Sequence, residues 1–208
     1  MEISDNVYDN ENIREDELIE LINSKPIQRL KGISQFGLPE EYYHKKEFSR
    51  YEHSVGVMIL LRRLNAGLEE QVAGLLHDVS HTAFSHVIDL LLGDSSKENF
   101  QDKTLLGYLE KTEIRSILNK YKFDYKKIAD LEKFSLLERP APSLCADRVD
   151  YALREIVLLH NQEDSKKIFN HLINFNGQIV FDSQEPAELF SKYYAHLNRE
   201  HWAGNETK

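Results

Sequence analysis

The chain has 208 residues, of which 41% are hydrophobic and 29% charged, and its formal net charge is −9. This composition is typical of a globular protein rather than a disordered one, and the acidic balance without a basic block argues against stable binding to nucleic acid. The single cysteine, Cys145, excludes a disulfide framework within the chain and favours a reducing, cytoplasmic location. We expect no signal peptide, because the acidic N-terminus lacks an apolar core. We expect no membrane span either, because the apolar run 55–61 is too short.

Helical periodicity dominates the chain. We expect helices over these ranges: 15–23, 26–33, 49–64, 68–78, 84–92, 99–111, 113–121, 125–133, 142–159 and 186–202. Pro26 occupies a first-turn position that a helix tolerates, while Pro142 and Ser143 supply a start signal for the helix that follows them.

One segment has a different pattern. β-Branched and aromatic residues flank Asn176-Gly177, which predicts a β-hairpin near the C-terminal helix. The sequence therefore predicts an all-α helical bundle with one small β-hairpin appendage, organised as a single domain. The helical core would span about residues 15–160, and the hairpin and last helix about residues 171–202.

Several polar residues that bind metals or transfer protons lie inside apolar helical runs: His53, His77, Asp78, His81 and His86. Helical spacing puts His53 on the apolar face of its helix, with Arg50 one turn before it. His77, Asp78 and His81 fall on one side of the next helix if the helical turn continues through His81. A lone histidine on an apolar face is more often a hydrogen-bonded core residue than a ligand.

A later helix carries a second polar face, made by Asp147, Asp150, Tyr151 and Arg154. Taken alone, this face could be a solvated surface with an Asp150–Arg154 ion pair four residues apart. Considered with the histidines, it favours a metal site. Uncompensated burial would cost several kcal/mol for each charged group, and a divalent ion removes that cost. Imidazole and carboxylate groups suit Mn, Fe or Zn, and spacing alone does not choose among them.

The stretch His77-Asp-Val-Ser-His81 also differs from the zinc-protease motif H-E-x-x-H only by Asp for Glu. In that interpretation Asp78 would act as general base with a side chain one methylene shorter. The interpretation leaves His53 and Asp147 unexplained, so we favour a different metal site.

Together these residues resemble the HD-domain superfamily of metal-dependent phosphohydrolases, whose pattern H…HD…D is matched by His53, His77-Asp78 and Asp147. Within that superfamily, the motif sequences are most similar to those of the deoxynucleoside triphosphate triphosphohydrolases. The segments DNVYDN, PIQRLKGISQFG, SRYEHSVGV, HDVSHTAFSHVID and DRVDYALRE occur in that family's order. The resemblance implies an HD-domain helical bundle.

The resemblance also implies residue roles. Four residues would hold one divalent ion (Mn, Fe, Zn, Mg, Ni or Co): His53, His77, Asp78 and Asp147. Three would be catalytic: His81 near the reacting phosphate, Asp89 orienting it, and Arg50 on the substrate phosphate. Gln35 and Tyr151 would line the nucleoside side of the pocket. The expected partner is a small phosphorylated substrate such as a nucleotide, and association of identical chains stays open.

Two departures from the family pattern bear on the substrate. Asn99 occupies the position at which the triphosphohydrolases have a second catalytic histidine. Tyr193 occupies the position at which they have an arginine that binds the triphosphate. Weak action on triphosphates is therefore expected, and a nucleotide-binding HD module with little turnover is an alternative. A di-iron HD oxygenase is another, but it needs extra histidines between the His77-Asp78 dipeptide and Asp147. The only two there are His81 and His86, and no histidine occurs over residues 87–159.

Overall fold

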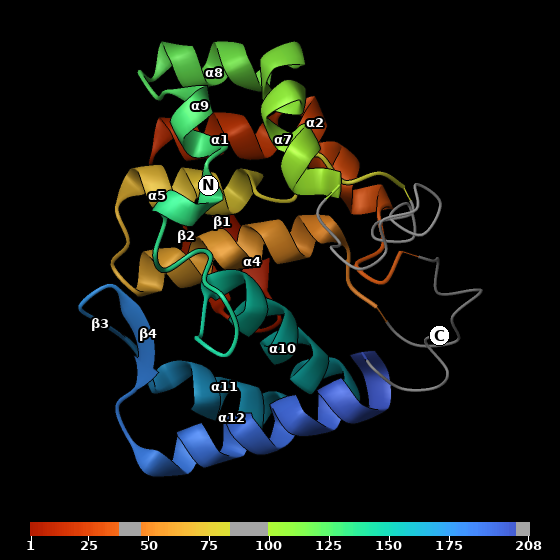
Figure 1. The fold of residues 1–208 in the computed structure, drawn as a ribbon, viewed down its shortest axis with the longest axis vertical. Coiled ribbons are helices and arrows are strands. Elements are labelled where there is room, and N and C mark those ends of the chain that lie inside the picture. The colour runs from red at the N-terminus through yellow and green to blue at the C-terminus, as the bar shows by residue number, and fades with distance from the viewer. Residues whose placement is uncertain (38–46, 84–99, 203–208) are drawn as a thin grey trace.

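The computed structural model describes residues 1–37, 47–83 and 100–202, with only the backbone described for residues 100–103. Its centre is a pair of packed helices, α4 (Arg50–Arg63) and α5 (Leu68–Leu76). Helix α10 (Ala146–Leu159) packs against α4 from the other side. Figure 1 shows these three helices between two further groups of helices.

One group lies above α4 and α5 in Figure 1. Its helices are α1 (Asp16–Asn23), α2 (Lys25–Arg29), α7 (Phe100–Lys111), α8 (Ile114–Lys120) and α9 (Tyr125–Ile128). Two short 3-10 helices, η1 (Leu30–Gly32) and η2 (Leu131–Lys133), follow α2 and α9 in the chain. The other group lies below and consists of α11 (Gln162–Asn170), α12 (Gln184–Leu197) and the short π-helix η3 (Asn198–Trp202). Two antiparallel hairpins complete the described fold: β1 (Glu2–Asp5) with β2 (Asp9–Asn12), and β3 (Leu172–Phe175) with β4 (Gln178–Phe181). The predicted all-α class is confirmed.

The start of α4 is fixed by a capping box. The Ser49 side chain accepts a hydrogen bond from the backbone N–H of Glu52, and the Glu52 carboxylate accepts one from the backbone N–H of Ser49. This reciprocal pair satisfies two donors that a helix N-terminus otherwise leaves open. The helix predicted over 49–64 is confirmed, and the cap sets the position of Arg50 at its start and of His53 where its second turn begins.

The contact between α4 and α5 depends on a small residue. A Cβ atom added to Gly74 would lie 2.4 Å from Leu61 Cδ1 and 3.2 Å from Val57 Cγ1. Both of those side chains belong to the apolar core and are fully buried. Gly74 thus lets α5 approach α4 closely, which brings the end of α5 next to the first turns of α4.

The sequence pattern predicts one of the two hairpins but not the other. The predicted hairpin is confirmed as β3–β4, with Asn176 and Gly177 at φ of 52° and 75° in the two-residue turn. The β1–β2 hairpin was not predicted, because its strands are acidic and lack β-branched alternation. Its turn is held instead by the Asp5 carboxylate, which accepts from the backbone N–H groups of Val7 and Tyr8.

Two further differences concern helices. Helix α10 begins at Ala146, so Pro142 and Ser143 precede the helix instead of starting it. Helix α11 was not predicted, although Asn161 caps it by accepting from the backbone N–H of Asp164. The helix expected over 84–92 lies outside the described residues, as do His86, Asp89 and Asn99. No helix within the described ranges has the length and apolar character needed to cross a membrane.

Candidate metal centre

His53 lies in the second turn of α4 and is completely buried, as its place on the apolar face predicted. Its ring nitrogens face two carboxylates of α10. Nδ1 donates to Asp150 Oδ2 at 2.7 Å, and Nε2 lies 2.9 Å from Asp147 Oδ1. The alternative of a solvated polar face on α10 is wrong, because Asp150 is fully buried and Arg154 is 4% exposed.

His77 follows the last residue of α5 and begins a turn that is not helical. Its Nδ1 donates to the carbonyl oxygen of Gly74 at 2.7 Å, which leaves Nε2 as the outward-facing ring atom. The turn is held from α2, where Arg29 donates to the carbonyl oxygens of Val79 and His81 at 2.8 and 2.9 Å. The helix therefore does not continue through His81, as the sequence-based expectation required, and His77 and His81 are positioned by a tight turn instead.

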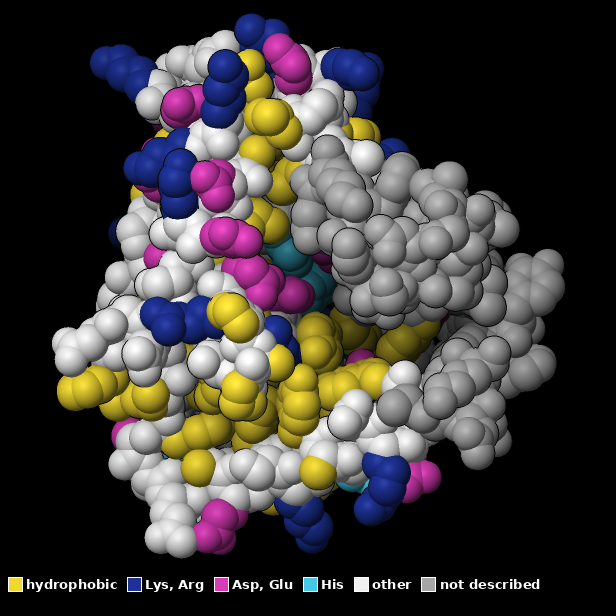
Figure 2. All heavy atoms as spheres, in the orientation of Figure 1, with side chains coloured by type: hydrophobic (Ala, Val, Ile, Leu, Met, Phe, Trp, Pro, Cys, Tyr) yellow, Lys and Arg dark blue, Asp and Glu magenta, His cyan; other side chains and the backbone are white. Residues whose placement is uncertain are grey.

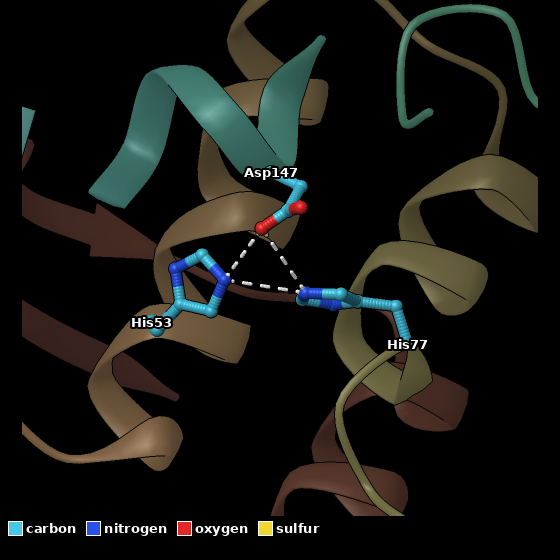
Figure 3. Close-up of side chains that lie close together, drawn as sticks. All are labelled: His53, His77 and Asp147. Atoms are coloured by element: carbon cyan, nitrogen blue, oxygen red, sulfur yellow. Dashed lines mark hydrogen bonds and ion pairs between the residues drawn. The ribbon is translucent and has the colours of Figure 1, made fainter. Parts of the chain in front are cut away.

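Three side chains from α4, α10 and the end of α5 point toward one another in Figure 3. His53 Nε2 lies 3.2 Å from His77 Nε2, and Asp147 Oδ1 lies 2.9 Å from the first and 3.6 Å from the second. All three ligand atoms fall within 4.8 Å of one another. Both rings use Nδ1–H for a protein acceptor and direct Nε2 inward, which is the arrangement that a metal-binding imidazole requires.

Asp78 adjoins this group without belonging to it. Its Oδ1 lies 3.5 Å from His77 Nε2, and its Oδ2 lies 3.8 Å from His53 Nε2. The same Oδ2 accepts from Arg50 Nη1 at 2.5 Å. Arg50 is 2% exposed, and its Nη2 also donates to the carbonyl oxygen of Gln35 at 3.2 Å. The structure thus forms a buried Arg50–Asp78 pair at the edge of the cluster.

The charges in the site act on one another. Burial would lower the pKa of His77, but the carboxylates of Asp78 and Asp147 raise it to about 9. Burial would raise the pKa of Asp78, but the positive charges of Arg50 and of the histidines hold it well below its usual range. Hydrogen bonds from His53 and His77 likewise outweigh burial and lower the pKa of Asp147. The carboxylates of Asp78 and Asp147 are therefore anionic, and Arg50 and the histidines face them with positive charge.

Of the other predicted residues, His81 and Tyr151 lie near the cluster. His81 is 3% exposed, and its Nε2 lies 3.2 Å from Asp78 Oδ1. Gln35 is half-buried, and its side-chain Oε1 is buried without a hydrogen-bond partner in the described part of the chain. The Tyr151 ring lies 6.4 Å from the His53 ring and packs edge-on against Trp202 at 5.1 Å. Asp89 lies outside the described residues.

The site opens on one side. Asp147 is the accessible member of the group, with 30% of its side chain exposed, whereas both histidines are buried. Figure 2 shows histidine side chains recessed in the middle of one face, with acidic side chains beside them and an apolar surface below.

Sequence reasoning missed the role of residues behind the cluster. Asp150 contacts the Nδ1 side of His53, and Tyr8 donates from its hydroxyl to Asp150 Oδ1 at 2.7 Å. Asp150 could have been found, because it lies one turn after Asp147 on the same face of a helix. Tyr8 had no such signal, since it reaches the site from a segment that is 142 residues away along the chain.

Comparison with known proteins agrees with this geometry. The model of the HD domain family matches residues 50–155, which contain every member of the cluster. An uncharacterised Bacillus subtilis protein, YdhJ, is 44% identical over 197 residues that cover 93% of this chain and 60% of that protein. Metal-dependent phosphohydrolase cns2 of Cordyceps militaris is 38% identical over 209 residues, covering 97% and 60%. The chain thus spans about 60% of the length of these two relatives.

Two further matches bear on branch and fold. The deoxynucleoside triphosphate triphosphohydrolase SAMHD1 of Bos taurus is 34% identical over 87 residues, covering 35% of this chain and 15% of that protein. This confirms the resemblance to that branch over a short segment. The crystal structure of a phosphohydrolase from Bacteroides thetaiotaomicron matches with a TM-score of 0.70 and 21% sequence identity. The match covers 100% of this chain and 56% of the phosphohydrolase chain. At that identity the match supports the fold. The family match extends over half the chain and includes the whole metal cluster, so the chain belongs to the HD domain family.

Proposed function

We propose that the chain hydrolyses a phosphoester of a nucleotide or a similar small phosphorylated metabolite. One observation carries the proposal: two imidazoles and a carboxylate from three separate segments converge in a buried site beside a buried arginine. The names of two matches, a metal-dependent phosphohydrolase and a phosphohydrolase, support the reaction class. SAMHD1 supports a nucleotide as substrate.

A divalent ion fits the donor set. His53, His77 and Asp147 would hold it, and Asp78 would complete the site by turning from Arg50 toward the histidines. When bound, such an ion supplies Lewis-acid polarisation of a phosphoryl oxygen. Among the described residues this is the one group of three ligand side chains close enough to share an ion.

The chain's own residues supply the other requirements. In hydrolysis a water oxygen bonds to phosphorus and releases one proton to solvent, while the bond from phosphorus to the leaving oxygen breaks and the leaving oxygen takes up a proton. Arg50 lies at the edge of the cluster and would stabilise charge on the phosphoryl oxygens, where phosphoryl transfer depends most on electrostatics. His81 would give the proton to the leaving oxygen, held by Asp78, whose Oδ1 lies 3.2 Å from His81 Nε2. By the family resemblance Asp89, which lies outside the described residues, would help to orient it.

The substrate would be small. Gln35 and Tyr151 would line its nucleoside end, since the Gln35 backbone carbonyl accepts from Arg50 and the Tyr151 ring lies 6.4 Å from the His53 ring. Asn99, which lies outside the described residues, replaces a histidine that would serve triphosphate cleavage. An amide is a poor proton donor compared with an imidazole near neutral pH. Nucleoside monophosphates are therefore the preferred candidates.

The test joins metal analysis to a phosphatase screen over nucleoside mono-, di- and triphosphates. We expect metal-dependent release of inorganic phosphate from a monophosphate and slow reaction with triphosphates. Rapid release of intact triphosphate from a deoxynucleotide would contradict the role given to Asn99. If triphosphate cleavage is slow, Asn99→His should accelerate it. Tight nucleotide binding without any metal-dependent turnover would support a binding module instead of an enzyme.

A further inference from the structure

The His53 ring is held from the side opposite the metal cluster. Its Nδ1–H donates to Asp150 Oδ2 at 2.7 Å, whereas its Nε2 faces Asp147 and His77. Asp150 is fully buried behind the ring and so lies away from any ion that His53 binds through Nε2. A carboxylate in this position fixes which ring nitrogen carries the proton and sets the direction of the other nitrogen.

Asp150 is itself fixed by two donors. Tyr8 donates its hydroxyl to Asp150 Oδ1 at 2.7 Å, and Arg154 Nε donates to Asp150 Oδ2 at 2.8 Å. Arg154 Nη2 in turn donates to Asp5 Oδ2 at 2.8 Å. All four side chains are buried, with Asp150 at 0%, Tyr8 at 2%, Arg154 at 4% and Asp5 at 5% side-chain exposure.

This network connects the metal cluster to the N-terminal hairpin. Asp5 ends β1, and Tyr8 lies in the turn between β1 and β2, so the hairpin supplies two of the groups behind α10. The backbone of α4 leaves space for Asp150 and Arg154 at Gly56, where an added Cβ would lie 1.9 Å from Arg154 Nη2 and 2.2 Å from Asp150 Oδ1. Three segments far apart in the sequence therefore meet directly behind His53.

Stability alone is a weak reason for such a network. A buried ion pair costs desolvation that its attraction often fails to recover, and apolar residues of similar size are commonly at least as stable. The orientation of His53 gives the network a purpose that apolar packing would not provide, because only a hydrogen-bond acceptor at Nδ1 holds the imidazole with Nε2 toward the cluster.

We propose that Asp150 is a positioning residue for the metal ligand His53, and that Tyr8 and Arg154 make metal affinity depend on the N-terminal hairpin. This inference rests on the proposed role of His53 as a metal ligand. It assigns to residues 5 and 8 a function in the metal centre, although neither contacts the cluster itself.

The test measures Mn²⁺ affinity by calorimetry on the full chain, with the melting temperature recorded without added ion. Asp150→Asn should weaken Mn²⁺ binding by about 10- to 100-fold, the usual effect of losing the carboxylate behind a metal-bound histidine. Tyr8→Phe removes one hydrogen bond to that carboxylate and should weaken binding to a smaller, measurable extent. Tyr121→Phe is the matched control, because the Tyr121 hydroxyl donates to Glu20 Oε2 at 2.8 Å far from the cluster.

The outcomes separate this inference from the proposed function. Weaker Mn²⁺ binding by Tyr8→Phe but not by Tyr121→Phe, at similar melting temperatures, would support the link to the hairpin. Wild-type affinity in folded Asp150→Asn and Tyr8→Phe, with Mn²⁺ bound normally by the parent chain, would overturn the inference and leave the metal site intact. If Asp150→Asn does not fold, Tyr8→Phe decides. Absence of Mn²⁺ binding by the parent chain would overturn the metal assignment, and this inference with it.

Discussion

The Nε2 atoms of His53 and His77 lie 3.2 Å apart, although the two residues are 24 positions apart in the chain. Each ring has already committed its Nδ1–H, to Asp150 and to the Gly74 carbonyl. Two imidazole nitrogens this close need a shared cation between or beside them, because two lone pairs repel each other. Without metal, a proton between the two nitrogens can offset this repulsion. A divalent ion offsets it better where a carboxylate such as Asp147 adds a third ligand.

The first prediction concerns that ion. Removal of it by a chelator should lower the melting temperature of the wild-type chain. An ion present at about 100 times its Kd stabilises the folded state by about 2.7 kcal/mol, which corresponds to roughly 5–10 °C for a chain of this size. His77→Ala should contain no ion by elemental analysis and should lose this response to chelation.

The control for that experiment is His171→Ala. His171 is a histidine with 40% side-chain exposure, bonded to Asp182 in the hairpin region and remote from the cluster. It should keep full metal occupancy. Full occupancy in His77→Ala as well would show that the ion, if present, is bound elsewhere.

The second prediction distinguishes the contribution of the positive charge of Arg50 from that of its planar guanidinium group. Arg50→Ala would leave the Asp78 carboxylate buried without its partner, at a cost of about 3–5 kcal/mol. Arg50→Lys keeps a positive charge near Asp78 but loses the planar fork that also reaches the Gln35 carbonyl. We expect the Lys variant to fold and bind metal with turnover reduced about a hundredfold, the scale of a lost electrostatic contact to the transition state.

Arg62→Lys serves as the matched control on the same helix. Arg62 pairs with Glu11 and Glu15 at the surface end of α4, with 23% of its side chain exposed. Its exchange should leave both kcat/KM and the melting temperature near wild-type values, since partly exposed pairs contribute little. Wild-type turnover in Arg50→Lys would rule out a catalytic role for the guanidinium.

Local patterns in the sequence predicted the parts of the fold that local physics controls. The capping box at Ser49 and the Asn176-Gly177 turn are complete within a few residues, and both are confirmed. The β1–β2 hairpin is different, since its position depends on Tyr8 and Asp5 bonding to α10 near the other end of the chain. No local pattern reports a contact of that length.

The candidate site divides in the same way. Helical spacing identified the buried face of His53, and one helical turn linked Asp147 to Asp150. The pairing of Arg50 with Asp78 was not foreseen, because it depends on where α5 ends. The turn after Leu76, held by Arg29 from α2, rotates Asp78 toward Arg50 and so decides which charges meet.

The third prediction tests the close packing behind His53. Gly56→Ala would place a methyl group 1.9 Å from Arg154 Nη2, so Arg154 and Asp150 must shift. We expect a lower melting temperature and weaker Mn²⁺ binding.

Gly107→Ala is the control, because nothing lies within 4 Å of an added Cβ in α7. There the exchange should stabilise the protein by about 0.4–1 kcal/mol through the unfolded state. Unchanged Mn²⁺ affinity in Gly56→Ala would mean that the ring of His53 tolerates displacement of its support.

The last prediction concerns the proton that the leaving oxygen requires. His81 is buried beside Asp78, with its Nε2 3.2 Å from Asp78 Oδ1, and could pass a proton to an alkoxide leaving from the cluster. His81→Gln keeps polarity and similar volume but donates no proton. Turnover of a nucleoside monophosphate should fall by about 10²–10⁴, the usual contribution of general acid catalysis, while the metal content stays at the wild-type level.

Leaving-group dependence makes this test specific to proton donation. The leaving phenolate of p-nitrophenyl phosphate is stable without a proton, so a missing donor should matter far less for that substrate. We therefore expect His81→Gln to lose much more activity on the nucleoside monophosphate than on p-nitrophenyl phosphate. Equal losses on both substrates would mean that His81 supports the site by position or charge alone, and the donor would then have to be sought among other residues around the cluster.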